Sequence, residues 1–339
     1  MAKRSFSALI VDRQPDDTRG AVKITELTSV DSLPHQADGL LIRVTHSCLN
    51  YKDALAITGR GKVLKNFPIV PGIDLAGVVE QADANNVFQP GNEVLVTGFG
   101  VGEKFSGGYA EFCSVNTDWV LPMPLGFSAQ DCMAVGTAGL TAMLSVLALE
   151  KHGVRPEQGP VLVTGAAGGV GSIAILILSK CGYEVIAVSG RVKDQGEYLR
   201  YLGAAQLINR EELAAPSSKP LDSERWAGAI DTVGGDTLAS ILRQTKYRGS
   251  VAACGLAGGV SLPTTVLPFI LRGVNLLGID SVMCPRPLRE EAWKRLSEDL
   301  DREKLQTLYN VISLREVPDM SEQLLLGNVR GRVVVELGV

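Results

Sequence analysis

A buried strand that runs through a glycine-rich turn into a helix is the feature that most limits what this chain can fold into. The apolar strand spans 161–164 and the helical stretch spans 172–180. Glycines three residues apart let the backbone turn tightly and approach a pyrophosphate, and the helix N-terminus offers N–H groups to the phosphates. A plain strand-to-helix turn is the alternative. We expect the turn to bind a dinucleotide through Gly165, Ala167, Gly168, Gly169, Val170 and Gly171.

The pattern that follows this turn predicts the doubly wound class of α/β fold. Short apolar strands alternate with helical stretches, as in a parallel sheet covered on both faces. The last strand would lie at a sheet edge, and such edges are commonly covered by pairing, so we expect a homodimer. The expected strands are 161–164, 184–188, 206–208, 228–231, 250–254 and 275–279.

The first third of the chain predicts a separate, β-rich domain of barrel-like form. A helix at 288–301 and a final strand at 332–337 follow the second domain, and that strand would pair more naturally with the first. We therefore expect a β-rich domain over 1–130 that is completed by about 285–339, and a nucleotide domain over 131–284. The expected strands of the first domain are 8–11, 40–46, 76–79, 93–96 and 109–115.

The residues after the second parallel strand indicate which dinucleotide is bound. A site for NAD places Asp or Glu there, about 20 residues beyond the turn, to hold the ribose 2′-OH. Here the strand ends in Ser189-Gly190-Arg191. A guanidinium can bind a 2′-phosphate that an acid would repel, so the sequence favours NADPH. Arg210, after the third strand, is expected in the same pocket; Lys193 is a further candidate whose ordinary interpretation is solvated surface.

Charge and composition exclude several other classes of function. The formal net charge is −4 over 339 residues, so there is no broad basic surface for nucleic acid or an anionic membrane. The N-terminus lacks the pattern of a secretory signal, and the dense apolar run 173–178 is too short to span a bilayer. We expect a cytoplasmic protein. The six cysteines are scattered, which fits neither a disulfide framework nor zinc-knuckle spacing.

The glycine turn and two further segments together resemble a known protein superfamily. Together with the turn, Pro71–Gly77 and Gly107–Phe112 resemble the medium-chain dehydrogenase/reductase superfamily over essentially the whole chain, which implies a GroES-like β-rich domain beside a Rossmann domain. Zinc members of that superfamily carry a catalytic Cys and a Gly-His-Glu segment. Here Asn50 and Ile73 stand at the ligand positions, so the resemblance is to the zinc-free branch, and we expect no metal.

Longer segments are similar to one group within that branch, the acryloyl-CoA reductases (NADPH). They are 49–59, 136–143, 254–259 and 262–272. The resemblance implies hydride transfer from NADPH to an α,β-unsaturated acyl-CoA and protonation of the enolate that forms. It also implies that the cofactor is contacted by Tyr51, Thr141, Leu256, Ile270, Ser281 and Asn328, and that Arg332 faces the substrate. From the residues alone, Leu256 and Ile270 would be interpreted as core. Thr137 and Thr141 are candidates to line the nicotinamide side, with ordinary helix hydroxyls bonded to their own backbone as the alternative.

The candidate catalytic residues lie on one short segment at the vacated ligand position. We expect Asn50 or Tyr51 to donate a hydrogen bond near the nicotinamide or the substrate carbonyl, and Asp53 to orient them or to join a proton relay. Alternatively, Asp53 caps a helix that begins near Ala54. Two other functions stay open: a quinone oxidoreductase with the same cofactor site, and a non-enzymatic NADPH-binding protein.

Overall fold

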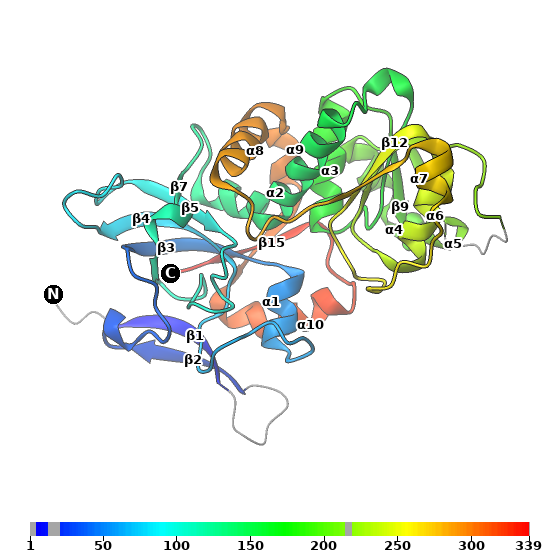
Figure 1. The fold of residues 1–339 in the computed structure, drawn as a ribbon. Helices are drawn as coiled ribbons and strands as arrows, with labels where there is room; N and C mark the ends of the chain where they lie inside the picture. The colour runs from blue at the N-terminus through cyan, green and yellow to red at the C-terminus, as the bar shows by residue number, and fades with distance from the viewer. Residues whose placement is uncertain (1–4, 13–20, 214–218, 339) are drawn as a thin grey trace. The chain divides into compact units, whose positions relative to one another are not determined.

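A computed structural model of the chain describes residues 5–12, 21–213 and 219–338 (Figure 1). The chain divides into two units, the first formed by Met1–Thr137 with Leu308–Val339 and the second by Ala138–Thr307. The second boundary lies beyond the expected position near 285, because helices α8 (Arg286–Asp299) and α9 (Arg302–Gln306) belong to the second unit. The apolar face of α8, which includes Trp293 and Leu296, is buried there.

The first unit is built on a seven-stranded sheet and a separate two-stranded ribbon. The sheet runs in the order β14-β15-β3-β4-β5-β7, with β6 paired to β3, and β1 pairs with β2. All pairings are antiparallel except that of β14 with β15. The strands are β1 (Phe6–Asp12), β2 (Ala21–Leu27), β3 (Leu40–Leu49), β4 (Asp74–Gln81), β5 (Glu93–Thr97), β6 (Phe112–Val115), β7 (Leu121–Pro122), β14 (Tyr309–Ser313) and β15 (Arg332–Glu336).

The C-terminal strand completes this unit, as its position in the sequence indicated. β15 pairs with β3 so that Val333 faces Leu49, which places the start of β15 beside the end of β3. Alternating side chains of β3, such as Leu40 and Ile42, are fully buried in the apolar core. The remaining elements of the unit are helices α1 (Tyr51–Ile57) and α10 (Val317–Leu325), which contact each other, and short 3₁₀ turns at Val30–Ser32, Thr117–Trp119 and Leu314–Glu316.

The second unit is a six-stranded parallel sheet with the doubly wound order that the sequence predicted. The order is β10-β9-β8-β11-β12-β13, and it reverses direction between β8 and β11. In open α/β sheets the ligand crevice lies outside the carboxyl ends of the strands at such a reversal. The strands are β8 (Val161–Val163), β9 (Val185–Ser189), β10 (Gln206–Asn209), β11 (Trp226–Asp231), β12 (Thr245–Ala253) and β13 (Asn275–Gly278), and β13 lies at the edge as expected.

Helices alternate with the strands of this sheet along the chain. They pack through apolar residues such as Ile173 and Leu199, which are fully buried. With α8 and α9, and a 3₁₀ turn at Pro156–Gln158, the helices of the unit are α3 (Gly169–Lys180), α4 (Val192–Leu202), α5 (Arg210–Leu213), α6 (Gly235–Gln244) and α7 (Leu267–Arg272).

Helix α2 (Ala129–Lys151) is much longer than the apolar run at 173–178, which is too short to span a bilayer. By length and composition it could cross a membrane, but 83% of its apolar window is buried, and buried core helices share this composition. The helix is interrupted at Gly136, whose φ of 50° and ψ of −156° are not helical. The boundary between the two units falls directly after this break, at Thr137.

Candidate active site

The glycine turn of the second unit has the local geometry of a phosphate cradle. Gly165 has a left-handed φ of 56°, and Gly168, in extended conformation, is the N-cap of α3 without a side-chain capping bond. A Cβ on Gly171 would lie 2.4 Å from the carbonyl oxygen of Gly165, so only glycine fits there. The first N–H groups of a helix lack acceptors within it, and at this turn they are available to an anion.

The ends of β9 and β10 bring the predicted selectivity residues together. Ser189 is paired in register with Asn209, the residue before Arg210. A Cβ on Gly190 would lie 2.6 Å from Nε of Arg210, so the guanidinium passes directly over this glycine. The hydroxyl of Ser189 accepts a hydrogen bond from the backbone N–H of Arg191 at 3.1 Å. Two guanidinium groups therefore follow the two strand ends at which the adenosine part of a dinucleotide binds.

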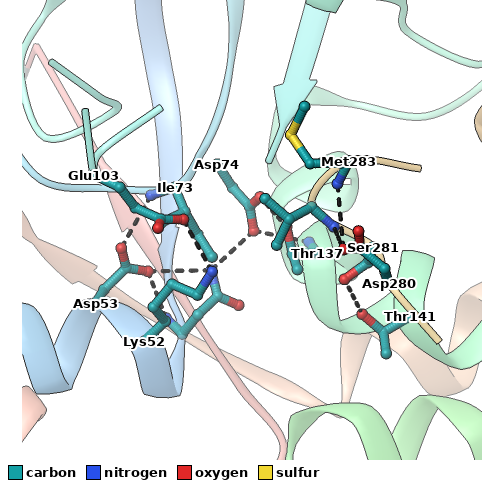
Figure 2. Close-up of polar contacts among 12 residues, drawn as sticks. Lys52, Asp53, Ile73, Asp74, Glu103, Thr137, Thr141, Asp280, Ser281 and Met283 are labelled. Carbon is teal, nitrogen blue, oxygen red and sulfur yellow. Dashed lines mark hydrogen bonds and ion pairs between the residues drawn. The ribbon is translucent and has the colours of Figure 1, made fainter. Parts of the chain in front are cut away.

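The other predicted cofactor contacts of the second unit fall into a buried pair and an exposed pair. Thr141 on α2 donates a hydrogen bond to the hydroxyl of Ser281 at 2.8 Å (Figure 2), although these residues are 140 positions apart. Leu256 and Ile270 are 61% and 67% exposed. Interpretation as core residues is therefore wrong for both, and their apolar surfaces are accessible to a ligand or another protein surface.

The first unit contains a buried polar cluster around Asp74, which is fully buried at the start of β4. One carboxylate oxygen of Asp74 accepts from Asn50 Nδ2 at 2.9 Å, from the Thr137 N–H at 2.8 Å and from the Cys48 thiol at 3.1 Å. The other accepts from the Thr137 hydroxyl at 2.5 Å (Figure 2). We call Cys48, Asn50, Asp53, Asp74, Thr137 and Arg332 the Asp74 cluster.

Within the Asp74 cluster, Asn50 and Asp53 form the start of helix α1. Asn50 is the N-cap, and its backbone N–H donates to Asp53 Oδ2 at 3.0 Å. The helix thus begins at Tyr51, and Asp53 is its third residue rather than the cap of a helix beginning near Ala54. The other oxygen of Asp53 accepts from the N–H of Ile73 at 3.0 Å (Figure 2). Asp53 therefore fixes α1 to the segment before β4.

Burial dominates the electrostatics of the cluster. Burial, and to a smaller extent the neighbouring Asp74, raise the pKa of Asp53 to about 7, although the hydrogen bonds from Asn50 and Ile73 act in the opposite direction. Burial also raises the pKa of the Cys48 thiol well above its usual range. Cys48 is therefore a neutral donor to Asp74, and Asp53 titrates near neutral pH.

Arg332 is placed differently from the substrate contact that we expected. Its side chain is 3% exposed. The guanidinium donates to the carbonyl of Ala134 at 3.0 Å, to Oδ1 of Asn50 at 3.1 Å and to the sulfur of Cys48 at 3.0 Å. β15 begins at Arg332, so Arg330, which is exposed, lies before the strand. These contacts indicate a positioning role for Arg332.

Tyr51 is the catalytic candidate whose side chain reaches the surface. It is 47% exposed, whereas Asn50 is 8% exposed and Asp53 is 1% exposed. The next residue, Lys52, forms an ion pair with Glu103 at 2.9 Å (Figure 2). Asn328 is also exposed, and its amide donates to Gln323 at 2.8 Å. Tyr51 is thus accessible to a ligand, whereas its neighbours Asn50 and Asp53 are buried and fix the backbone at the start of α1.

Sequence reasoning considered Ile73, at the position of a lost metal ligand, but missed the central position of Asp74 beside it. The available signal was an acid directly after Ile73, inside an otherwise apolar segment. Among the residues that the structure describes, no group of three or more His, Cys, Asp or Glu side chains is arranged to hold a metal ion.

A doubly wound unit with this glycine turn, joined to a β-rich unit with this buried cluster, defines a medium-chain dehydrogenase/reductase. Two family models agree: the alcohol dehydrogenase GroES-like domain matches residues 36–125, and a model described as zinc-binding dehydrogenase matches residues 169–298.

Full-length relatives define the family more closely. The acrylyl-CoA reductase AcuI of Ruegeria pomeroyi is 48% identical over 98% of this chain and 99% of that protein. A probable acrylyl-CoA reductase AcuI of Escherichia coli is 49% identical over 98% and 100%. The crystal structure of the Salmonella enterica yhdH oxidoreductase in complex with NADP has a TM-score of 0.93 and 48% identity, covering 98% of this chain and all of that one. The chain belongs to the acrylyl-CoA reductase family, within the quinone oxidoreductase-like branch of the superfamily.

Proposed function

We propose that this protein reduces the C=C bond of an α,β-unsaturated acyl-CoA with NADPH, and that acryloyl-CoA, converted to propionyl-CoA, is its principal substrate. The substrate class is supported by the 48% and 49% identity to acrylyl-CoA reductases over nearly the whole chain. The preference for NADPH over NADH is supported by the guanidinium of Arg210, which lies over Gly190 next to Arg191, because a guanidinium can bind the 2′-phosphate.

The residues of the second unit fit this cofactor. The glycine turn from Gly165 to Gly171 leaves room for a pyrophosphate, since side chains are absent or small along it. Arg191 and Arg210, with Ser189 and Gly190, would hold the 2′-phosphate. Bound NADPH supplies the hydride. Thr141 and Ser281 would hold the nicotinamide side, and the exposed Leu256 and Ile270 would cover the cofactor.

In the first unit we assign Tyr51 as the donor to the thioester carbonyl. Hydride addition at the β-carbon places negative charge on the thioester oxygen, and a preorganised hydroxyl lowers the barrier by stabilising that charge. Asn50 and Asp53 would act through α1 by fixing the backbone that carries Tyr51. Asp74 and Arg332 would in turn fix Asn50. Asn328 would contact the cofactor from its exposed position.

Three further properties belong to the proposal. Because Asn50 and Ile73 occupy the positions of zinc ligands in related enzymes, we infer that turnover needs no metal. The edge strand β13 would pair with a second copy, giving a homodimer. A cytoplasmic location is also part of the proposal, and the net charge of −4 disfavours nucleic-acid and anionic-membrane partners.

A spectrophotometric screen of NADPH and NADH against acryloyl-CoA, crotonyl-CoA and a simple quinone tests the function. We expect NADPH oxidation with acryloyl-CoA, less with crotonyl-CoA, and little with the quinone or with NADH. Faster turnover of the quinone would establish the quinone oxidoreductase alternative. Absence of oxidation with every acceptor, in protein that binds NADPH, would favour a non-enzymatic binding protein.

A further inference from the structure

Another buried carboxylate, outside the Asp74 cluster, lies in the nucleotide unit. Asp231 is the last residue of β11 and is 0% exposed. β11 pairs with β8 so that Ile230 faces Val163, which places Asp231 beside Thr164. The sheet order reverses between these two strands. Asp231 therefore lies directly beneath the crevice at which a dinucleotide crosses the sheet.

The carboxylate of Asp231 accepts hydrogen bonds from groups on both sides of this reversal. Oδ1 accepts from the hydroxyl of Thr164 at 2.7 Å and from the Val233 N–H at 3.3 Å. Oδ2 accepts from the N–H of Gly234 at 2.7 Å. Thr164 completes the arrangement, because its hydroxyl accepts from the Thr232 N–H at 2.9 Å. Each of these contacts joins the loop after β11 to itself or to the start of the glycine turn.

The same loop is held against the glycine turn and against the loop after β12. The Thr232 hydroxyl donates to the carbonyl of Thr164 at 3.0 Å, and a Cβ on Gly165 would lie 2.2 Å from that hydroxyl. The carbonyl of Asp231 accepts from the Cys254 N–H at 2.9 Å, and Val233 accepts from Gly258 at 2.7 Å. The loops that follow β8, β11 and β12 are therefore fixed to one another around Asp231.

The strand order shows which half of the cofactor these loops would face. Arg191 and Arg210 follow β9 and β10, on one side of β8, and mark the adenosine end. The pyrophosphate would lie at the start of α3. β11 and β12 are on the opposite side of β8, so their loops face the half that carries the nicotinamide.

From this arrangement we propose that Asp231, together with Thr164, is a positioning residue that fixes the crevice for the nicotinamide half of NADPH. The inference rests on the proposed function only for the identity of the cofactor. An amide at 231 would direct an NH₂ group toward N–H or O–H donors, and the loops after β8 and β11 would separate. The adenosine end, on the other side of β8, would keep its contacts.

The test compares NADPH with 2′,5′-ADP, which contains only the adenosine end. Dissociation constants are measured by calorimetry for Asp231→Asn, Thr164→Val and Thr164→Ser, with the exposed Asp236→Asn as a matched control. We expect NADPH to bind about 10-fold more weakly to Asp231→Asn and Thr164→Val. Thr164→Ser keeps both hydroxyl contacts and should bind within twofold of the wild type, as should Asp236→Asn. Binding of 2′,5′-ADP should change less than twofold throughout.

Two results would overturn this inference. Unchanged NADPH affinity in Thr164→Val would show that the contacts do not position the cofactor. Parallel losses of NADPH and 2′,5′-ADP would show that they support the fold in general. If Asp231→Asn does not fold, the Thr164→Val and Thr164→Ser pair decides the question. Wild-type protein that binds 2′,5′-ADP but reduces no enoyl-CoA would contradict the proposed reaction while leaving this test intact.

Discussion

The side-chain amide of Asn50 donates to Oδ2 of Asp74 at 2.9 Å, while its own oxygen accepts from Arg332 at 3.1 Å. Both ends of this amide are thus used inside the protein, which supports the proposed role of Asn50 in holding Tyr51 rather than binding the substrate. Removing it would leave a buried carboxylate and a buried guanidinium with fewer partners.

We therefore predict that Asn50→Ala lowers the free energy of unfolding by about 1–3 kcal/mol, as measured by urea denaturation. The exposed Asn328→Ala serves as a control and should change it by less than about 0.5 kcal/mol. Unchanged stability of Asn50→Ala, combined with a loss of turnover, would show instead that Asn50 acts directly on the substrate.

Tyr51 should behave in the opposite way, because its side chain is 47% exposed. Loss of one hydrogen-bond donor to a developing oxyanion costs a factor of about 10²–10³ in kcat in enzymes where it has been measured. We predict that Tyr51→Phe lowers kcat with acryloyl-CoA by about this factor, with NADPH affinity and stability unchanged. Steady-state kinetics check it, with the exposed Tyr247→Phe as control. Normal turnover in Tyr51→Phe would remove Tyr51 from the mechanism.

The choice of cofactor should depend on Arg210, whose guanidinium lies over Gly190. A charge-assisted contact to the 2′-phosphate is absent with NADH. We predict that Arg210→Ala raises KM for NADPH about 10-fold, equivalent to about 1.4 kcal/mol, and leaves KM for NADH within twofold. Arg200→Ala, at an exposed position on α4 of the same unit, is the matched control. Equal effects on both cofactors would place Arg210 outside the phosphate site.

The pH dependence of stability should report Asp53, because its pKa rises from an ordinary value of 3.8 to about 7 in the folded protein. Between these values the folded state holds a proton that the unfolded state has lost, so this group's contribution to stability declines as pH rises through that window. The slope from one such group is at most about 1.4 kcal/mol per pH unit.

Asp53→Asn removes this titration. Urea unfolding between pH 4 and 7 should therefore show a smaller decline for the variant than for the wild type, whatever their absolute stabilities. Parallel curves would mean that Asp53 has the same pKa in both states.

Local patterns were sufficient to predict most of the fold. The strands of the parallel sheet follow from short apolar runs between turns, and β13 lies at the predicted edge. The glycine turn and the residues after β9 are each a short continuous segment, so the sequence alone was sufficient to predict their chemistry. The boundary near 285 was less accurate, because whether α8 packs on one unit or the other depends on tertiary contacts that its own sequence does not specify.

The buried clusters were not predictable in the same way. Arg332 reaches Asn50 across 282 positions, and Thr164 reaches Asp231 across 67. A charged residue near a predicted strand is ordinarily interpreted as surface, and for Arg332 the family resemblance implies a substrate contact. Only the pairing of β15 with β3 shows that this guanidinium is enclosed.

Transfer of a labelled hydride tests the central claim most directly. The protein is dialysed against a chelator and incubated with acryloyl-CoA and NADPH carrying deuterium at the transferred position, and the acyl product is analysed by mass spectrometry and NMR. We predict undiminished turnover and one deuterium per propionyl-CoA, located at C3. Turnover that is lost with the chelated metal, or a product without deuterium at C3, would contradict the account.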